Sequence, residues 1–363
     1  MKKEIMVQYE GKDCYKICIT ESFDLLNEKL EEAMLHSGKK VCVVSDDIVA
    51  GFYMEKITSV LKEKYNQVFS YVFKAGEASK NTETVGSLYE HLIRNRFDRN
   101  DFLIALGGGV VGDLTGFAAA TYLRGIDFVQ VPTSLLAQVD SSIGGKTGVD
   151  HLQYKNMVGA FHMPKLVYMN MEVFNTLPGK QFSNGMGEVI KHGLIKDEKY
   201  YEFLKSEYNS IADRDSEALT SMIERSCNIK REVVERDPKE KGERALLNFG
   251  HTVGHAIEKL SDFSLLHGEC VSLGIVAASY ISMKKGYLTA ENVADIENTL
   301  KHYGLPVRVS GYDPAEVLSA TKNDKKMIGN RIKFVLLKSI GEAFIDTSLE
   351  DSDILEGIDY VIE

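Results

Sequence analysis

The hydrophobic positions in the first half of the chain form short β-rich runs that alternate with amphipathic, helix-like segments. Residues 40–49, 101–120 and 128–142 each pass from an apolar run through a turn into a helical pattern. Strands that alternate with helices in this way are typical of a parallel sheet covered by helices. The pattern therefore predicts an α/β, Rossmann-like nucleotide-binding domain over residues 1–172.

The pattern changes at about residue 172. Long amphipathic helices follow, such as residues 216–237, and few convincing strands occur before the apolar run KFVLL at residues 333–337. A chain of 363 residues also exceeds the size of one typical hydrophobic core. We therefore expect a second, mostly α-helical domain over residues 173–363.

Composition narrows the class of protein. With 44% hydrophobic and 26% charged residues, the chain resembles an ordinary globular protein. Its 43 Lys and Arg face 53 Asp and Glu, and this net charge of -10 argues against a nucleic-acid partner. An anionic ligand would then need a local cluster of basic residues. Five cysteines without a CxxC pair, and the lack of an apolar run suited to a signal peptide or membrane helix, predict a cytoplasmic protein without a membrane partner.

A glycine-rich turn is the first candidate for chemistry. Glycines at residues 107–109 follow an apolar strand, and Gly112 and Asp113 lie in the start of the next helix. Glycines let the backbone approach a pyrophosphate, whose charge the helix N-terminus stabilises. We favour this nucleotide site over a tight turn without a ligand, because strand, glycines and helix occur in the required order. Asp46, at the end of an earlier strand, either binds a ribose or caps a helix.

A second candidate is the Gly- and Ser-rich segment 139–164, which is expected to be a loop. It contains the polar residues Asp140, Lys146, Lys155 and Asn156. Lysines in such loops bind phosphate or carboxylate, although a solvated surface loop is the alternative. The loop also contains the apolar residues Ile143, Met157, Val158 and Phe161. These apolar residues predict a partly buried loop, in which a bound anion would offset the cost of burying lysine.

The segment LNFGHTVGHAIEKL, residues 247–260, places His251 and His255 on one face of a predicted helix. The spacing alone leaves three interpretations open: metal ligands, a proton-transfer pair, or a polar stripe on a packed helix. Thr252 stands where the H-E-x-x-H metalloproteases have their general base, so peptide hydrolysis is not supported.

Two further helical segments complete a possible metal site. Glu188 and Lys191 lie three residues apart on one predicted helix, and His267 and Glu269 lie at the entry to another. With His251 they offer a Glu/His/His set, which suits Zn²⁺ or another divalent ion with an open coordination position. Nearby polar residues are Arg244, Asn248, Lys325 and Lys326. The candidate chemistry therefore combines a metal, a dinucleotide and several anion-binding groups.

This combination resembles the 3-dehydroquinate synthase family over essentially the whole chain. The motifs GGGVVGD, PTSLLAQVDSSIGGKTGV, KNMVGAF, GEVIKHG, LNFGHTVGHAIE and HGECV occur in the order and approximate spacing of that family. The resemblance implies bound NAD⁺, a divalent metal (zinc or cobalt), and a homodimer in which Arg124 reaches across the interface. It also implies that Glu188, His251 and His267 bind the metal, whereas His255 serves the substrate.

The resemblance assigns the remaining site residues by position. The implied NAD-contacting residues are Asp46, Glu77, Lys80, Gly108, Gly109, Val110, Asp113, Thr133, Ser134, Leu136, Asp140, Lys146, Lys155 and Thr176. The implied substrate-site residues are Arg124, Asp140, Lys146, Lys155, Asn156, Lys191, Lys230, Arg244 and Asn248, with either Lys325 or Lys326.

The implied reaction belongs to the shikimate pathway and converts 3-deoxy-D-arabino-heptulosonate 7-phosphate to 3-dehydroquinate and phosphate. It passes through transient oxidation by NAD⁺, phosphate elimination, re-reduction and an aldol closure. The main alternative is another sugar-phosphate cyclase, such as 2-deoxy-scyllo-inosose synthase, but such relatives lose the residues at Arg244 and Asn248. A metal-dependent polyol dehydrogenase and a catalytically silent protein of the same fold are more distant alternatives.

Overall fold

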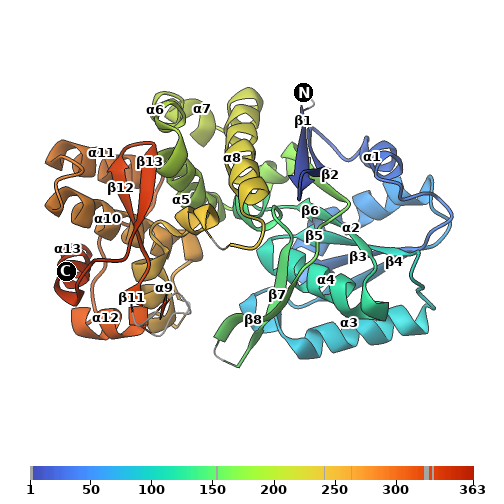
Figure 1. Ribbon diagram of the computed structural model, residues 1–363. Helices are drawn as coiled ribbons and strands as arrows, with labels where there is room; N and C mark the ends of the chain where they lie inside the picture. Colours follow the sequence, from blue (N-terminus) through green and yellow to red (C-terminus); the bar gives the residue numbers. More distant parts are fainter. Residues whose placement is uncertain (1–2, 153, 241, 263, 323–326, 329–330) are drawn as a thin grey trace. The chain divides into compact units, whose positions relative to one another are not determined.

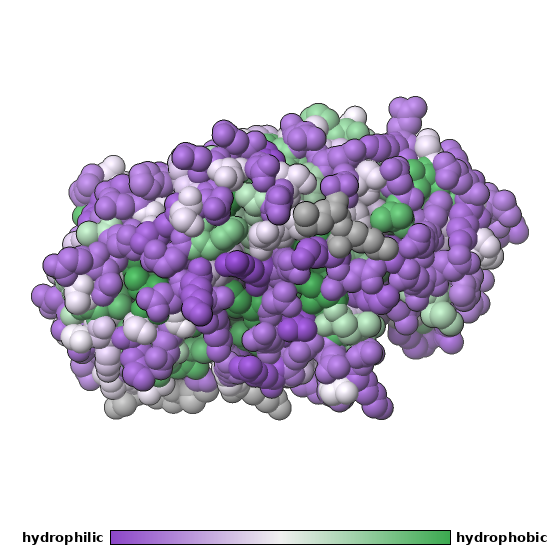
Figure 2. Space-filling view, turned by 90° about the horizontal axis from the view of Figure 1, so that it is seen from above, coloured by the Kyte–Doolittle hydropathy of each residue, from purple (hydrophilic) through white to green (hydrophobic). Residues whose placement is uncertain are grey.

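The computed structural model describes residues 3–152, 154–240, 242–262, 264–322, 327–328 and 331–363 (Figure 1). The chain forms two compact units, Met1–Leu177 and Pro178–Glu363, called here the N-terminal and the C-terminal unit. Hydrophilic residues cover most of the face seen in Figure 2, and hydrophobic residues occur on it in small groups. Within the described ranges, no helix is both long enough and apolar enough to span a membrane.

The N-terminal unit contains a seven-stranded sheet. In spatial order its strands are β1 (Lys3–Tyr9), β2 (Lys12–Thr20), β9 (Leu166–Asn170), β6 (Asp127–Pro132), β5 (Phe102–Gly107), β3 (Val41–Asp46) and β4 (Val68–Phe73). Only β1 runs antiparallel to its neighbour among these paired strands. Numbered along the chain, the five strands from β4 to β9 have the order 2-1-3-4-5 of doubly wound α/β folds.

Helices cover both faces of this sheet, as the alternation of side chains along its strands requires (Figure 1). These helices are α1 (Leu26–Glu32), α2 (Asp47–Lys62), α3 (Thr82–Arg94) and α4 (Gly109–Thr121). Val41 and Val43 of β3 pack in the core beneath α1 and α2, whereas Cys42 and Val44 pack in the core beneath α3 and α4. The predicted α/β Rossmann-like fold is therefore confirmed.

The strand order creates a switch point between β3 and β5. From β3 the chain moves outward to β4, and it then returns to the other side of β3 as β5. In open α/β sheets, ligands bind at such a reversal, beyond the carboxyl ends of the strands. Asp46 ends β3 and Gly107 ends β5, so both lie at this point of the sheet.

The predicted loop at residues 139–164 is instead mostly a β-hairpin. After the short π-helical turn η3 (Ala137–Ser141), strand β7 (Lys146–His151) pairs antiparallel with β8 (Tyr154–Phe161). The predicted burial of the loop is wrong for Met157 and Phe161, whose exposed fractions are 45% and 51%. Strand β7 packs closely on α4, whereas β8 lies outside it and alternates between half-buried and exposed positions.

The C-terminal unit is mostly helical, as predicted. Its helices are α5 (Gly179–Lys196), α6 (Glu198–Ser206), α7 (Tyr208–Ala212), α8 (Ser216–Arg236), η5 (Glu243–Asn248), α9 (His251–Leu260), α10 (His267–Lys284), α11 (Ala290–His302), α12 (Pro314–Lys322) and α13 (Asp351–Val361). Its short strands are β10 (Met327–Ile328), β11 (Arg331–Ile332), β12 (Phe334–Ser339) and β13 (Glu342–Asp346). The predicted strand at residues 333–337 corresponds to β12.

Glycines allow three of these helices to approach one another unusually closely. A Cβ atom built on Gly268 of α10 would lie 1.9 Å from the backbone oxygen of Asn184 in α5. A Cβ atom on Gly274 of α10 would lie 1.7 Å from the backbone oxygen of Gly250, which is the N-cap of α9. Because no larger residue fits at these contacts, glycine sets the distances between α5, α9 and α10.

Candidate active site

The glycine-rich turn of the N-terminal unit lies between β5 and α4, as predicted. Gly108 is the N-cap of α4, and no side chain caps this helix end. A Cβ on Gly107 would lie 2.4 Å from the side chain of Val111, so the strand-to-helix turn needs glycine there. The backbone N–H of Thr133 donates to the Gly107 oxygen at 3.0 Å, which joins the ends of β5 and β6. The uncapped amide groups at the start of α4 suit an anion such as a pyrophosphate.

Asp46 caps helix α2. Its carboxylate accepts a hydrogen bond of 2.8 Å from the backbone N–H of Val49. Burial raises the pKa of the carboxyl group, and the backbone hydrogen bonds partly oppose this shift. The helix-cap interpretation is therefore confirmed, while a contact with a ribose stays a prediction.

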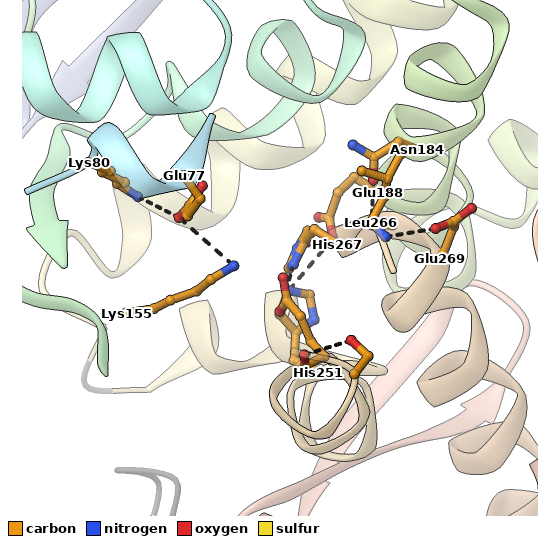
Figure 3. Close-up of polar contacts among 12 residues, drawn as sticks. Glu77, Lys80, Lys155, Asn184, Glu188, His251, Leu266, His267 and Glu269 are labelled. Carbon is orange, nitrogen blue, oxygen red and sulfur yellow. Dashed lines mark hydrogen bonds and ion pairs between the residues drawn. The ribbon is translucent and has the colours of Figure 1, made fainter. Parts of the chain in front are cut away.

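A buried lysine organises the polar residues near the hairpin. The Lys80 ammonium lies 2.7 Å from the Asp113 carboxylate and donates to the Asn156 amide oxygen at 2.6 Å. Burial disfavours its charge, but Asp113 and Glu77 outweigh burial and raise the pKa of Lys80. The carboxylate of Glu77 lies 3.9 Å from Lys80 and 3.8 Å from Lys155 (Figure 3). Four predicted charged residues and the predicted Asn156 therefore form one polar cluster.

The other predicted residues of the N-terminal unit are more scattered. Thr176 forms a hydrogen bond with the Tyr53 hydroxyl, and Ser134 accepts one of 3.3 Å from the backbone N–H of Ala137. Lys146 is exposed at the start of β7. Arg124 is exposed and has a φ of 69°, a left-handed conformation that costs a non-glycine residue energy. Val110 in α4, and Leu136 and Asp140 around η3, are half-buried.

The C-terminal unit brings the predicted metal ligands together. Glu188 projects from the middle of α5, while His251 and His267 are the first residues of α9 and α10. The Oε1 atom of Glu188 lies 3.6 Å from Nε2 of His251 and 3.7 Å from Nε2 of His267 (Figure 3). One donor atom from each residue lies within 4.8 Å of the others. A divalent ion between them would have three protein ligands, and a fourth position could take substrate.

The orientation of the imidazole rings of His251 and His267 also suits metal binding. Nδ1 of His251 lies 3.1 Å from the backbone oxygen of Phe249, and Nδ1 of His267 lies 3.5 Å from Oε2 of Glu258. An N–H at Nδ1 that donates to such an acceptor leaves the lone pair of Nε2 for a metal. Both imidazoles therefore direct their ligand nitrogen toward Glu188.

Other charged side chains lie against Glu188 and His267. Lys191 forms a buried ion pair with Glu188 one helical turn away. Burial disfavours the imidazolium form of His267, but hydrogen bonds and charge from Glu188 and Glu258 outweigh it and raise its pKa to about 9. Since a metal binds the neutral ring, binding must displace this proton.

His255 lies next to the two predicted ligand histidines. Its ring centroid is 5.0 Å from that of His251 and 5.8 Å from that of His267. Together with Glu258 and His267 it offers a second group of three donors, which spacing along α9 did not reveal. Sequence analysis missed Glu258, although its place three residues after His255, on the same helical face, was a usable signal.

Besides Lys191 on α5, three predicted substrate-site residues of this unit lie on α8 and η5. Lys230 is 5% exposed and Arg244 is 2% exposed. Arg244 donates to the backbone oxygen of Pro238 at 2.8 Å, and Asn248 donates to the Glu240 carboxylate at 3.0 Å. Lys325 and Lys326 lie outside the described residues.

Comparisons with known proteins identify the family of the chain. Sequence profiles of the 3-dehydroquinate synthase N-terminal and C-terminal regions match residues 70–184 and 185–327. The 3-dehydroquinate synthase of Ruminiclostridium cellulolyticum is 43% identical over 344 residues, which cover 95% of each chain.

Two solved structures share the fold over nearly the whole chain. The 2-epi-5-epi-valiolone synthase ValA from Streptomyces hygroscopicus subsp. jinggangensis, with NAD⁺ and Zn²⁺ bound, has a TM-score of 0.88 at 25% identity, covering 98% of this chain and 99% of that one. A 2-deoxy-scyllo-inosose synthase, complexed with carbaglucose-6-phosphate, NAD⁺ and Co²⁺, has a TM-score of 0.88 at 24% identity, covering 99% of each chain. The profiles and the 43% identity show that the chain belongs to the 3-dehydroquinate synthase family.

Proposed function

We propose that this chain converts 3-deoxy-D-arabino-heptulosonate 7-phosphate to 3-dehydroquinate and phosphate, using NAD⁺ and a divalent metal, either zinc or cobalt. The family acts on a phosphorylated sugar substrate, and its solved structural neighbours contain NAD⁺ with Zn²⁺ or Co²⁺. The observation that carries the proposal is the convergence of Glu188, His251 and His267 from three helices onto one point.

Each unit contributes one part of this chemistry. When bound, NAD⁺ and the metal supply reversible oxidation of one substrate hydroxyl and polarisation of its oxygen. Glu188, His251 and His267 hold the metal, and the turn around Gly108 and Gly109 cradles the NAD⁺ pyrophosphate. The geometry of the turn supports this assignment, because the uncapped start of α4 lies beside the switch point of the sheet.

The buried basic residues account for binding of an anionic substrate by an acidic protein. Arg244 and Lys230 contact the carboxylate or the phosphate of the substrate, since guanidinium and ammonium groups form strong charge-assisted hydrogen bonds with both. Asn248, Lys191, Lys146, Lys155, Asn156 and Asp140 complete this set. His255 holds or moves a proton at the substrate, and its position beside both ligand histidines supports that role.

Arg124 contributes to the active site of a second copy in a homodimer. Its exposure and its left-handed backbone support this role, because strained conformations concentrate at functional sites. The reaction proceeds in the cytoplasm, in agreement with the five cysteines, which are all present as thiols.

Phosphate release tests the proposed reaction. The purified protein receives the substrate with catalytic NAD⁺, before and after chelation of the metal, while absorbance reports NADH. We expect phosphate release that stops on chelation, with no net NADH. Failure to release phosphate with metal and NAD⁺ present would overturn the proposal, and glucose 6-phosphate and glycerol would then test the cyclase and dehydrogenase alternatives.

A further inference from the structure

The two ligand histidines are oriented by different kinds of acceptor. The acceptor for His251 is the backbone oxygen of Phe249, two residues away along the same chain segment. The acceptor for His267 is the side chain of Glu258, which belongs to another helix. Only the second restraint therefore depends on a side chain that substitution can remove.

Helix α9 brings Glu258 to this position. His251, His255 and Glu258 are spaced by four and then three residues, so all three lie on one face of the helix. That face supplies a metal ligand at its start and, two turns later, the carboxylate that faces His267. The Glu258 side chain is only 6% exposed, and a buried carboxylate is costly unless a cation or donor faces it.

His267 needs such a restraint more than His251 does. The side chain of His267 is 27% exposed, compared with 11% for His251, so packing restricts it less. Both residues begin a helix, so the difference in exposure is what separates them. The orientation of His267 toward Glu188 therefore depends on what its Nδ1 atom faces.

Glu258 has one competing role. His255, Glu258 and His267 also offer donor atoms within 4.8 Å of one another, so Glu258 could itself bind an ion. The ring of His267 decides between the roles, because its Nε2 faces Glu188 and its Nδ1 faces Glu258. A metal at Nε2 leaves Nδ1–H to donate to Glu258, which makes the carboxylate an outer partner of the ligand.

We propose that Glu258 is a positioning residue that fixes the ring of His267 and thereby strengthens metal binding. This inference rests on the proposed function, because it takes Glu188, His251 and His267 as the ligands. Outer partners of this kind change metal affinity by about 10- to 100-fold. Replacement of Glu258 should therefore weaken metal binding by that factor without changing the number of bound ions.

The test compares Glu258→Gln with Glu297→Gln. Glu297 is also buried, 8% exposed, but it faces Arg308 at 3.1 Å and the Tyr360 hydroxyl at 2.8 Å. Both variants lose one buried carboxylate in the same unit. Metal-free full-length protein is titrated with Zn²⁺ against a chromophoric chelator, and with Co²⁺ while its visible absorption bands are recorded. We expect Glu258→Gln to bind one Zn²⁺ about 10- to 100-fold more weakly, with shifted Co²⁺ bands, and Glu297→Gln to match the unaltered protein.

Two results would overturn the inference. Unchanged Zn²⁺ affinity and Co²⁺ bands in Glu258→Gln would make Glu258 merely structural, and binding of two ions by the unaltered protein but one by the variant would make it a ligand. If the glutamine variant does not fold, Glu258→Asp, which keeps the charge but withdraws it by one methylene, faces the same criteria. These readouts need no turnover, so a protein that binds metal normally but releases no phosphate would refute the proposed reaction alone.

Discussion

Replacing Gly274 with alanine tests whether the packing of α10 on α9 positions the metal ligands. The new Cβ would lie 1.7 Å from the backbone oxygen of Gly250 and 2.9 Å from the backbone nitrogen of Gly254. Since real Cβ atoms stay at least 3.0 Å from such neighbours, the helices must separate by about 1.3 Å, the difference between 3.0 and 1.7 Å.

The energy of this change follows from two opposing effects. Overpacking a well-packed contact costs roughly 1–3 kcal/mol, and the upper value applies because backbone atoms cannot rotate away. Alanine is a better helix former than glycine by about 1 kcal/mol, which offsets part of the cost. We expect Gly274→Ala to lower the free energy of unfolding by about 2 kcal/mol.

The same displacement should weaken metal binding. Gly250 directly precedes His251, so a shift on the order of 1 Å at this contact moves the ligand nitrogen, whereas metal-ligand distances vary by only about 0.2 Å. We expect at least a roughly 10-fold loss of Zn²⁺ affinity, since misplaced support of a ligand costs about 10- to 100-fold. Urea unfolding followed by circular dichroism and Zn²⁺ competition with a chelator measure the two effects.

Gly86→Ala in α3 is the matched control. A Cβ at Gly86 meets no atom within 4 Å, so this variant should gain roughly 0.5–1 kcal/mol from helix propensity and leave Zn²⁺ affinity unchanged. If Gly274→Ala unfolds at the same urea concentration as the unaltered protein and binds Zn²⁺ equally well, the helix spacing does not control the site.

Three further predictions concern the ligands, the buried lysine and the thiols. His251→Ala removes a proposed ligand itself, so the Zn²⁺ affinity measured by chelator competition should fall more than roughly 100-fold, the upper value for loss of an outer partner. A smaller loss would exclude His251 as a ligand. Lys80→Met breaks the buried 2.7 Å ion pair with Asp113 and should lower the free energy of unfolding in urea by about 3 kcal/mol. Lys56→Met breaks an exposed pair with Glu172 and should cost less than about 1 kcal/mol, so equal costs would contradict this reasoning. Burial raises the pKa of Cys18 to about 11, that of Cys227 to about 12 and that of Cys42 as well. At pH 8 a thiol reagent should therefore label at most Cys14 in the folded protein, but all five cysteines in guanidinium. Rapid labelling of a second thiol in the folded protein would refute the burial argument.

Local patterns predicted the elements well, because their signals are contained in short segments. The strand, glycines and helix around Gly108 follow one another within one short segment of the chain. The hairpin β7–β8 was missed because its glycines resemble a loop. Those glycines in fact let the strands pair closely: a Cβ on Gly148 would lie 2.8 Å from the backbone oxygen of Val158. Residues on the outer face of such a hairpin can be apolar without being buried, which the composition of the segment could not reveal.

Roles within the metal set could not be predicted from spacing. His251 and His255 are equivalent along α9, and only the position of α10 places the Nε2 atoms of His251 and His267 on the same carboxylate oxygen. The resemblance to the family, not the spacing, implies that His251 binds the metal and His255 does not. Glu258 shares a face of α9 with His251 and His255, which was a usable signal, but its partner His267 belongs to α10, so their contact appears only in the folded structure.

Each proposed metal ligand directly adjoins a glycine at a helix contact. Glu188 follows Gly187, His251 follows Gly250 and His267 precedes Gly268, and a Cβ on any of these glycines would come within 3.0 Å of another helix or its backbone. Glycine at these three positions lets the helix backbones approach closely beside the residues that carry the donor atoms. The glycines therefore bring the ligands together through packing of the helices, and the site should be preformed before metal binds. It follows that removal of the metal should leave the helical content of the C-terminal unit unchanged, which circular dichroism of the chelated protein can measure; loss of helix on chelation would show that the ion, rather than the glycine contacts, assembles the three helices.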